Sequence, residues 1–182
     1  MLWWYVLKKL GSTSGFSLIE LLIVTSVAVI LMMAAAPSFT QLLDNLQLES
    51  AANRLATQFK QTRFEAIRRN QKLYIHNLGM ASPTKNTWCV LVTANTTAPP
   101  SCAHEQVISG LHGDAFSRLS ISNSKVRLSV DPVRAITGSG TAYVLTSPGM
   151  GAGVSVEVKI SSKSRVRVCS VGQVVGFEDC GP

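Results

Sequence analysis

Charged residues are scarce in this sequence. They make up 15% of the 182 residues, whereas 46% are hydrophobic and the mean hydropathy is +0.24. A chain of this length has room for one domain with a real core and an appendage, but not for two full domains. The apolar content is high for a soluble domain and indicates that one segment lies in lipid.

Patterns typical of an enzyme or a metal site are also missing. The sequence has no Cys-x-x-Cys pair, and Cys102-Ala103-His104 alone does not predict zinc. Local spacing brings no hydroxyl, histidine and carboxylate together. The glycine-rich stretch 149–153 precedes a strand pattern instead of the helix that a phosphate loop requires, so it is predicted to be a flexible connection. We therefore expect no catalytic residue, no cofactor and no metal.

The apolar content is concentrated in residues 16–36, which contain no helix breaker and one charge, Glu20. As a helix this stretch spans roughly 31 Å, about one hydrocarbon thickness. Lys8 and Lys9 precede it, and Arg54 is the first cation after it. The positive-inside rule therefore keeps the N-terminus in the cytoplasm and places the rest of the chain outside.

Two simple interpretations of this stretch fit poorly. A secretory signal peptide would use Ala34-Ala35-Ala36 as its cleavage site, but Pro37 makes a poor junction and Glu20 would be costly in the apolar core. A plain membrane anchor explains the length. It gives no reason for a carboxylate near the start of the span, where a charge costs roughly 2.5–3.5 kcal/mol on insertion scales.

The residues around Gly15 favour a third interpretation. The sequence Gly15-Phe16-Ser17-Leu18-Ile19-Glu20 follows a short basic leader and opens the apolar stretch. This order resembles the processing site of type IV prepilins and type II secretion pseudopilins. The resemblance implies that a prepilin peptidase removes residues 1–15 by cutting between Gly15 and Phe16 and then methylates the amine of Phe16. Residues 16–36 would be a transmembrane helix that later lies in a filament core.

Glu20 has a physical role in this interpretation. In a filament of packed apolar helices, a buried carboxylate persists only beside a positive group. We expect the free amine of Phe16 on a neighbouring pilin to supply that group, so Glu20 is predicted to act in assembly. The expected location is the bacterial inner membrane, with a single pass and a periplasmic C-terminal domain, and then a pilus or pseudopilus.

After Pro37 the pattern is that of an amphipathic helix. Residues 16–70 are predicted to form one long helix, kinked or locally melted at Pro37, because proline lacks an amide donor and clashes with the preceding turn. We expect the first half in lipid and residues 37–70 on a globular domain. The apolar residues that share one helical face are Leu48, Ala52, Leu55, Phe59 and Ala66.

From residue 71 onward the hydrophobic period changes to two, which is typical of strands. Residues 161–164 are turn-forming and are predicted to join the last two strands in a hairpin. Residues 71–182 are thus expected to be a β-rich head. The predicted class is α+β, type IV pilin-like, with a long helix packed on an antiparallel sheet. The predicted strands are 72–76, 88–92, 125–130, 142–145, 154–160 and 165–171.

Several later segments extend the resemblance. Residues 55–71, LATQFKQTRFEAIRRNQ, look like the helix end of the FimT and GspH family of minor pilins and pseudopilins. Trp88-Cys89-Val90, Asp131-Pro132 and Arg165-Val166-Arg167-Val168-Cys169 with Cys180 look like the FimT side of that family. The resemblance therefore runs almost to the C-terminus.

The four cysteines all follow the apolar stretch. They are Cys89, Cys102, Cys169 and Cys180. An exported location fits an oxidising compartment and two disulfides. Their short separations predict the pairs Cys89–Cys102 and Cys169–Cys180, each stabilising the fold by about 2–4 kcal/mol.

A basic group lies near the C-terminus. The whole chain has a formal charge of +7; without Lys8, Lys9 and Glu20, residues 37–182 carry +6, which favours an anionic partner. Arg165 and Arg167 lie two apart, so their side chains share one face of a strand. Lys163 can join them from the turn, and Lys159 joins them if the hairpin register places it opposite.

This basic group has two interpretations. One is an ordinary solvated strand face. The other follows from the resemblance, because a Gly-Arg-x-Arg motif near the C-terminus of FimT-like minor pilins is implicated in DNA binding during natural transformation. Here Ser164 replaces the glycine, whereas both arginines remain. Since guanidinium groups suit phosphate recognition, the resemblance implies that Arg165, Arg167 and Lys163 bind double-stranded DNA without sequence preference.

A second cationic cluster, Arg68, Arg69 and Lys72, ends the predicted helix. Cations at this end offset the helix dipole, so a structural role is the preferred interpretation. Two other functions remain open for the whole chain. It could be a GspH-like pseudopilin of a type II secretion system, or a priming or structural minor pilin that contacts only other pilins.

Overall fold

The computed structural model describes residues 15–80, 84–85, 87–103, 105–137, 140–151, 153–163 and 165–181. Only the backbone is described at residues 35–38, 84–85 and 135–137. The predicted leader before Gly15 lies outside the described residues, and so do His104 and Ser164. The chain forms two compact units, Met1–Phe39 and Thr40–Pro182.

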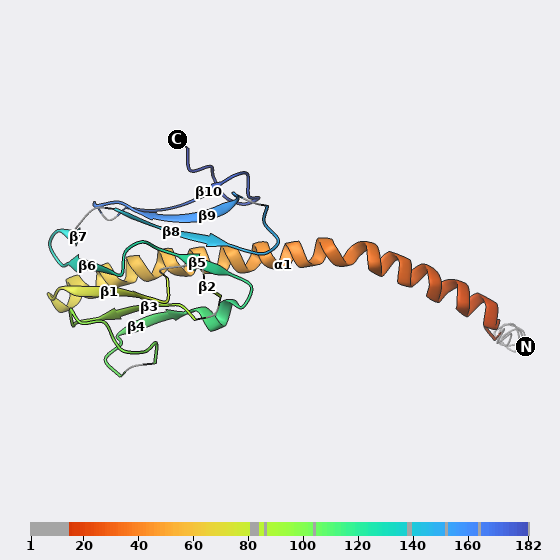
Figure 1. The fold of residues 1–182 in the computed structure, drawn as a ribbon, viewed down its shortest axis with the longest axis horizontal. Coiled ribbons are helices and arrows are strands. Elements are labelled where there is room, and N and C mark those ends of the chain that lie inside the picture. The colour runs from red at the N-terminus through yellow and green to blue at the C-terminus, as the bar shows by residue number, and fades with distance from the viewer. Residues whose placement is uncertain are drawn as a thin grey trace, which may run out of the picture. The chain divides into compact units, whose positions relative to one another are not determined.

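One long helix, α1 (Leu18–Arg69), begins in the first unit and continues into the second (Figure 1). Its backbone stays helical through Pro37, so the local melting that was one expectation there does not occur. In the first unit, residues 15–34 are exposed, apart from Ala28, which is partly buried. By length and composition this part of α1 can cross a membrane.

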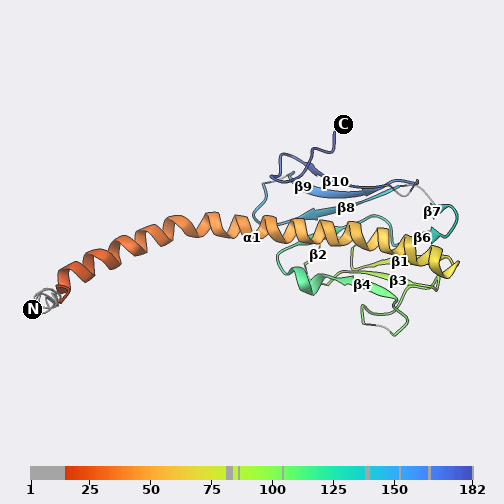
Figure 2. The ribbon, with the colours of Figure 1, turned by 180° about the vertical axis from the view of Figure 1, so that it is seen from behind.

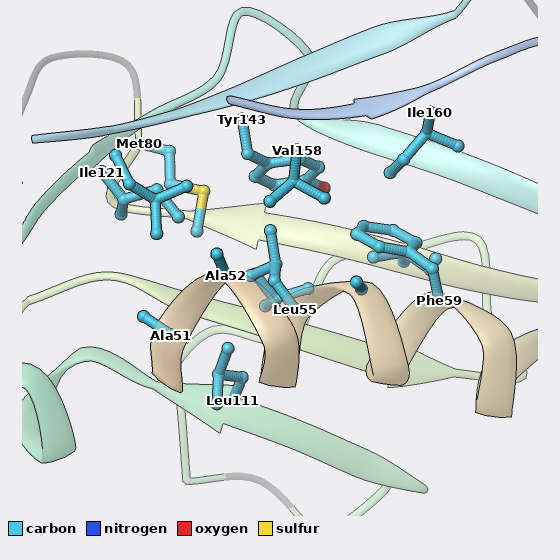
Figure 3. Close-up of a cluster of buried hydrophobic side chains, with 14 of the residues drawn as sticks. Ala51, Ala52, Leu55, Phe59, Met80, Leu111, Ile121, Tyr143, Val158 and Ile160 are labelled. Carbon is cyan, nitrogen blue, oxygen red and sulfur yellow. The ribbon is translucent and has the colours of Figure 1, made fainter. Parts of the chain in front are cut away.

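The later part of α1 supplies one side of the hydrophobic core of the second unit. Ala52, Leu55 and Phe59 are buried, and Figure 3 shows them directed at side chains of the strands. The Phe59 ring lies 5.3 Å from the ring of Tyr143. The helix ends at Arg69 because Asn70 adopts a positive φ of 49°, at the position predicted for the end.

The strands of the described residues form two antiparallel sheets that pack around α1 in the second unit (Figures 1 and 2). Sheet A has the order β4-β3-β1-β6-β7, and sheet B has the order β10-β9-β8-β5-β2. The strands of sheet A are β1 (Leu73–Leu78), β3 (Cys89–Thr93), β4 (Ser109–His112), β6 (Arg127–Asp131) and β7 (Ala135–Thr137). Those of sheet B are β2 (Thr84–Lys85), β5 (Ser120–Ser122), β8 (Thr141–Thr146), β9 (Ser155–Ile160) and β10 (Val166–Val171).

The predicted class is confirmed: a long helix packs on antiparallel β-structure. The six predicted strands correspond to β1, β3, β6, β8, β9 and β10, with ends displaced by at most two residues. The short strands β2, β4, β5 and β7 and the 3-10 helix η2 (Gly113–Phe116) were not predicted.

Two polar contacts fix the sheets and loops around α1. The hydroxyl of Tyr143 on β8 donates to Asn77 Oδ1 on β1 at 2.8 Å, which ties sheet B to sheet A; burial raises the pKa of this tyrosine. Asp44 of α1 is buried and accepts a hydrogen bond from Arg118. A Cβ at Gly149 would lie 2.5 Å from Asp44 Oδ2, so a larger residue here would have to displace the Asp44 carboxylate.

Candidate functional site

The C-terminal hairpin presents its basic residues on one face. Its turn is closed by two hydrogen bonds: the amide of Ser161 donates to the Arg165 carbonyl at 2.9 Å, and the amide of Arg165 donates to Ser161 Oγ at 3.1 Å. Val166 and Val168 are partly buried and pack on the core. Because side chains alternate along a strand, Arg165 and Arg167 are exposed on the opposite face.

The strand register adds a third cation. Arg167 of β10 pairs directly with Lys159 of β9. Lys159, Arg165 and Arg167 line one open hollow of about 500 Å³, whose floor includes Ala142 and Ile160. Lys163, which the sequence placed in this group, is exposed in the turn but does not line the hollow. Three cations around one concave surface can bind an anion such as a phosphate.

The charges of this hollow are largely unneutralised. Lys159 Nζ lies 3.1 Å from Glu157 Oε2. Within the part of the chain that the structure describes, Lys163, Arg165 and Arg167 form no ion pair. Among the described residues, Arg167 Nη2 donates to a backbone carbonyl, that of Asp179, at 3.2 Å. The two guanidinium groups therefore keep donors free for an external anion.

A disulfide holds the C-terminal segment beside this strand. The structure pairs Cys169 with Cys180, and Cys89 with Cys102, which are the pairs that the sequence predicts. The amide of Ser170 donates to the Glu178 carbonyl at 2.7 Å, and the amide of Cys180 donates to the Ser170 carbonyl at 2.8 Å. This segment therefore positions the Asp179 carbonyl, which accepts the hydrogen bond from Arg167.

One group of described side chains has metal-ligand spacing, namely Glu157, Cys169 and Cys180. The two sulfur atoms are bonded to each other, so neither is a thiolate ligand. Glu157 alone is left, and it already lies against Lys159. The group is better explained as part of the disulfide and its surroundings than as a metal site.

The cations at the end of α1 differ from those of the hairpin. Arg68 and Arg69 both bind the carboxylate of Glu65, and Lys72 lies 3.7 Å from Asp131. A hydrogen bond from Arg68, with a smaller contribution from that of Arg69, lowers the pKa of Glu65 to about 2. These contacts agree with the structural role preferred for this cluster.

The predicted assembly residues lie at the start of the chain that the structure describes. Gly15 and Phe16 precede α1, and Phe16 is exposed. Glu20 lies in the first helical turn, where its negative charge is favourable to the helix dipole. The cut after Gly15, the methylation of Phe16 and the pairing of Glu20 with a neighbouring amine stay predictions.

The architecture and these surfaces together define a pilin-type subunit: a long, partly apolar helix whose later half packs on an antiparallel β-structure. The family model described as "Type II transport protein GspH" matches residues 51–172. The chain therefore belongs to the GspH family of minor pilins and pseudopilins. No curated protein matches the chain.

Crystal structures of one minor pilin support this fold. Two crystal forms of the type IV minor pilin FimU from Pseudomonas aeruginosa strain PAO1 resemble the chain. The P21 form has a TM-score of 0.52 and 15% identity, covering 66% of this chain and 87% of FimU. The P65 form has a TM-score of 0.50 and 16% identity, covering 66% and 91%. The minor pseudopilin EpsH of the Vibrio cholerae type 2 secretion system has a TM-score of 0.48 and 12% identity, covering 70% and 99%.

Proposed function

We propose that this chain is a FimT-like minor pilin of a type IV pilus that binds extracellular double-stranded DNA for uptake in natural transformation. One observation carries the proposal. Arg165 and Arg167 stand exposed on one strand face, share a hollow with Lys159, and have no carboxylate partner among the described residues. Membership of the minor pilin and pseudopilin family supports the filament part of the role.

The mechanism is electrostatic. Arg165, Arg167 and Lys163, joined by Lys159, grip phosphates through charged hydrogen bonds, because guanidinium presents paired donors that match phosphate oxygens. Phosphate contacts position a protein on a duplex without reading its bases, so binding has little sequence preference. The apolar part of α1 ties the captured duplex to the filament.

A titration at several salt concentrations tests the site. Residues 40–182 are suited to it because they contain every buried residue of the core. Each phosphate neutralised contributes about 0.9 to the slope of log affinity against log salt, so Arg165→Gln plus Arg167→Gln should reduce that slope by roughly 1.8. At 0.1 M salt this corresponds to about 60-fold weaker binding.

The matched control removes two arginines that already have a partner. Arg68→Gln plus Arg69→Gln makes the same formal change of charge, but Glu65 neutralises part of these cations in the native head. We expect a much smaller change in slope for this pair. A hairpin variant that binds duplex DNA as tightly as the native head, with an unchanged slope, would show that the hairpin is not the site.

We propose further that the chain is processed as a prepilin. A prepilin peptidase cuts after Gly15 and methylates the amine of Phe16, and the apolar part of α1 then crosses the bacterial inner membrane with the head in the periplasm. The Gly15-Phe16 junction, Glu20 and the exposed apolar helix support this. Mass spectrometry of the membrane-extracted protein should find Phe16 at the N-terminus. An intact leader, or a start at Pro37, would refute it.

A second candidate is a GspH-like pseudopilin of a type II secretion system, and the family that matches residues 51–172 favours it. That protein would be structural and would have no DNA role, and a priming minor pilin would behave in the same way. If neither the native head nor the hairpin variant binds DNA at low salt, these structural roles become the better account.

A further inference from the structure

Near the end of α1, two large apolar side chains are exposed to solvent. Phe64 is 73% exposed and Ile67 is 49% exposed. Lys60, Phe64 and Ile67 are spaced by four and three residues, and Arg63 precedes Ile67 by four, so these side chains share one helical face. We call these four residues the helix-end patch.

A hollow adjoins this patch. It has a volume of about 470 Å³ and lies between Phe64 and Arg68 of α1 on one side and Val92 and Ile108, at the β3 and β4 side of sheet A, on the other. Its wall combines the exposed ring of Phe64 and aliphatic side chains with polar and charged ones, among them Glu65 and Ser109. A single apolar side chain from another molecule could be seated beside Phe64.

The charge around the patch is mostly positive, and the acidic residue that lines the hollow, Glu65, is already paired. Arg68 and Arg69, at the rim, are bound to Glu65. Lys60 and Arg63 make no ion pair with any residue that the structure describes. The patch is therefore an apolar centre with two uncompensated cations on the same helical face.

We propose that the helix-end patch docks the head of a different pilin, not a second copy of this chain, and that this partner presents an apolar side chain flanked by carboxylates. The proposal rests on the filament-subunit part of the proposed function and does not depend on DNA binding. An aromatic side chain beside a pocket is the usual centre of a protein interface, and complementary charge at the rim fixes partner and orientation. Lys60 and Arg63 select acidic groups on the partner.

Nucleic acid is a poorer match for this surface. The cations nearest the hollow, Arg68 and Arg69, already share a carboxylate, which lowers their attraction for phosphate. The apolar part of the lining, Phe64 and Ile108, gains most from an apolar occupant, because burial of apolar surface supplies the main favourable term in association.

The test compares the entry of full-length variants into filaments in the native host. Phe64→Ser plus Ile67→Ser should lower the amount of the chain in sheared filaments by about tenfold relative to the amount in the membrane. Lys60→Glu plus Arg63→Glu should act in the same direction, because it repels the acidic partner. The matched control is Val133→Ser plus Val175→Ser, since both valines are 87% exposed and lie outside the patch.

Folding and DNA binding are measured on residues 40–182 of each variant. The proposal is supported if a patch variant enters filaments poorly while its thermal midpoint and salt slope are unchanged. It does not depend on the DNA titration of the hairpin variant, which tests the proposed function separately. A photoreactive phenylalanine analogue at position 64 should crosslink to an acidic segment of a different pilin. Incorporation equal to that of the control pair would overturn the proposal. A crosslink to a second copy of this chain, or weaker DNA binding by Phe64→Ser plus Ile67→Ser with normal incorporation, would overturn it as well.

Discussion

The two basic groups of the head have similar composition but different partners. At the end of α1, Arg68 and Arg69 share the carboxylate of Glu65. On the hairpin, Arg165 and Arg167 lie two residues apart and have no such partner among the described residues. A count of cations would treat the two groups alike. The comparison teaches that an arginine is available to an external anion when the fold places no carboxylate beside it.

The same distinction applies to acidic residues in the two units. Asp44 is buried beside Arg118 in the second unit. Glu20 is exposed in an apolar stretch of the first unit and has no ion pair with a described residue. We infer that charges with partners inside the chain stabilise the head, whereas charges without partners serve contacts with other molecules.

The largest expected effect concerns Glu20. Glu20→Val should remain in the membrane but enter filaments poorly, because it removes the partner of an incoming amine. Breaking a buried charge pair costs about 3–5 kcal/mol, so incorporation should fall by about 100-fold or more. The measurement is the ratio of filament-bound to membrane-bound protein after shearing.

Glu20→Gln separates charge from packing, because glutamine keeps the shape of the side chain. It should assemble almost as poorly as the valine variant. Normal incorporation of either variant would contradict the assembly role. It would also remove the distinction between Glu20, which serves contacts with other molecules, and Asp44, which stabilises the head.

A smaller effect is expected at Asp44, whose charge has a partner inside the head. The side chain of Asp44 is 3% exposed, whereas that of Arg118 is 42% exposed, so water compensates part of the loss when the pair is broken. Asp44→Asn should therefore lower the free energy of unfolding by about 2 kcal/mol and leave DNA binding unchanged. Urea unfolding measures the first quantity, with the exposed Asp114→Asn as control.

The pH dependence of unfolding sharpens this prediction. The hydrogen bond from Arg118 holds the pKa of Asp44 below its usual value of 3.8. A lowered pKa in the folded state means that the contribution is present above the unfolded pKa and is lost as pH falls through the folded one. The stability difference between the native head and Asp44→Asn should therefore be full at pH 7 and shrink in strong acid. A constant difference would argue against this pairing.

The sequence could predict the elements that have a long, regular pattern. The helix from Leu18 to Arg69 and the six longer strands show it clearly. Strands β2, β4, β5 and β7 contain only two to four residues, too few to establish a period of two. The division of the strands between two sheets depends on pairings between distant segments, which no local pattern contains.

The candidate site was predictable in part for the same reason. Spacing alone put Arg165 and Arg167 on one face, but only the register of β9 with β10 sets Lys159 opposite Arg167. The glycine-rich stretch 149–153 was expected to be a flexible connection. The structure adds a contact between Gly149 and Asp44, which lie so far apart in the chain that the sequence gives no sign of it.

The smallest expected effect comes from converting the paired basic group into an unpaired one. Glu65→Gln removes the shared carboxylate and leaves Arg68 and Arg69 free at the end of α1. If a carboxylate partner is what keeps these arginines from DNA, the variant should bind duplex DNA about threefold more tightly at low salt, and the gain should vanish as salt screens the exposed charges. The titration used for the hairpin measures the effect, and Glu49→Gln, an exposed carboxylate of the same helix, is the control for net charge alone. An equal gain for Glu49→Gln would mean that overall charge, and not the local partner, decides which cations bind DNA.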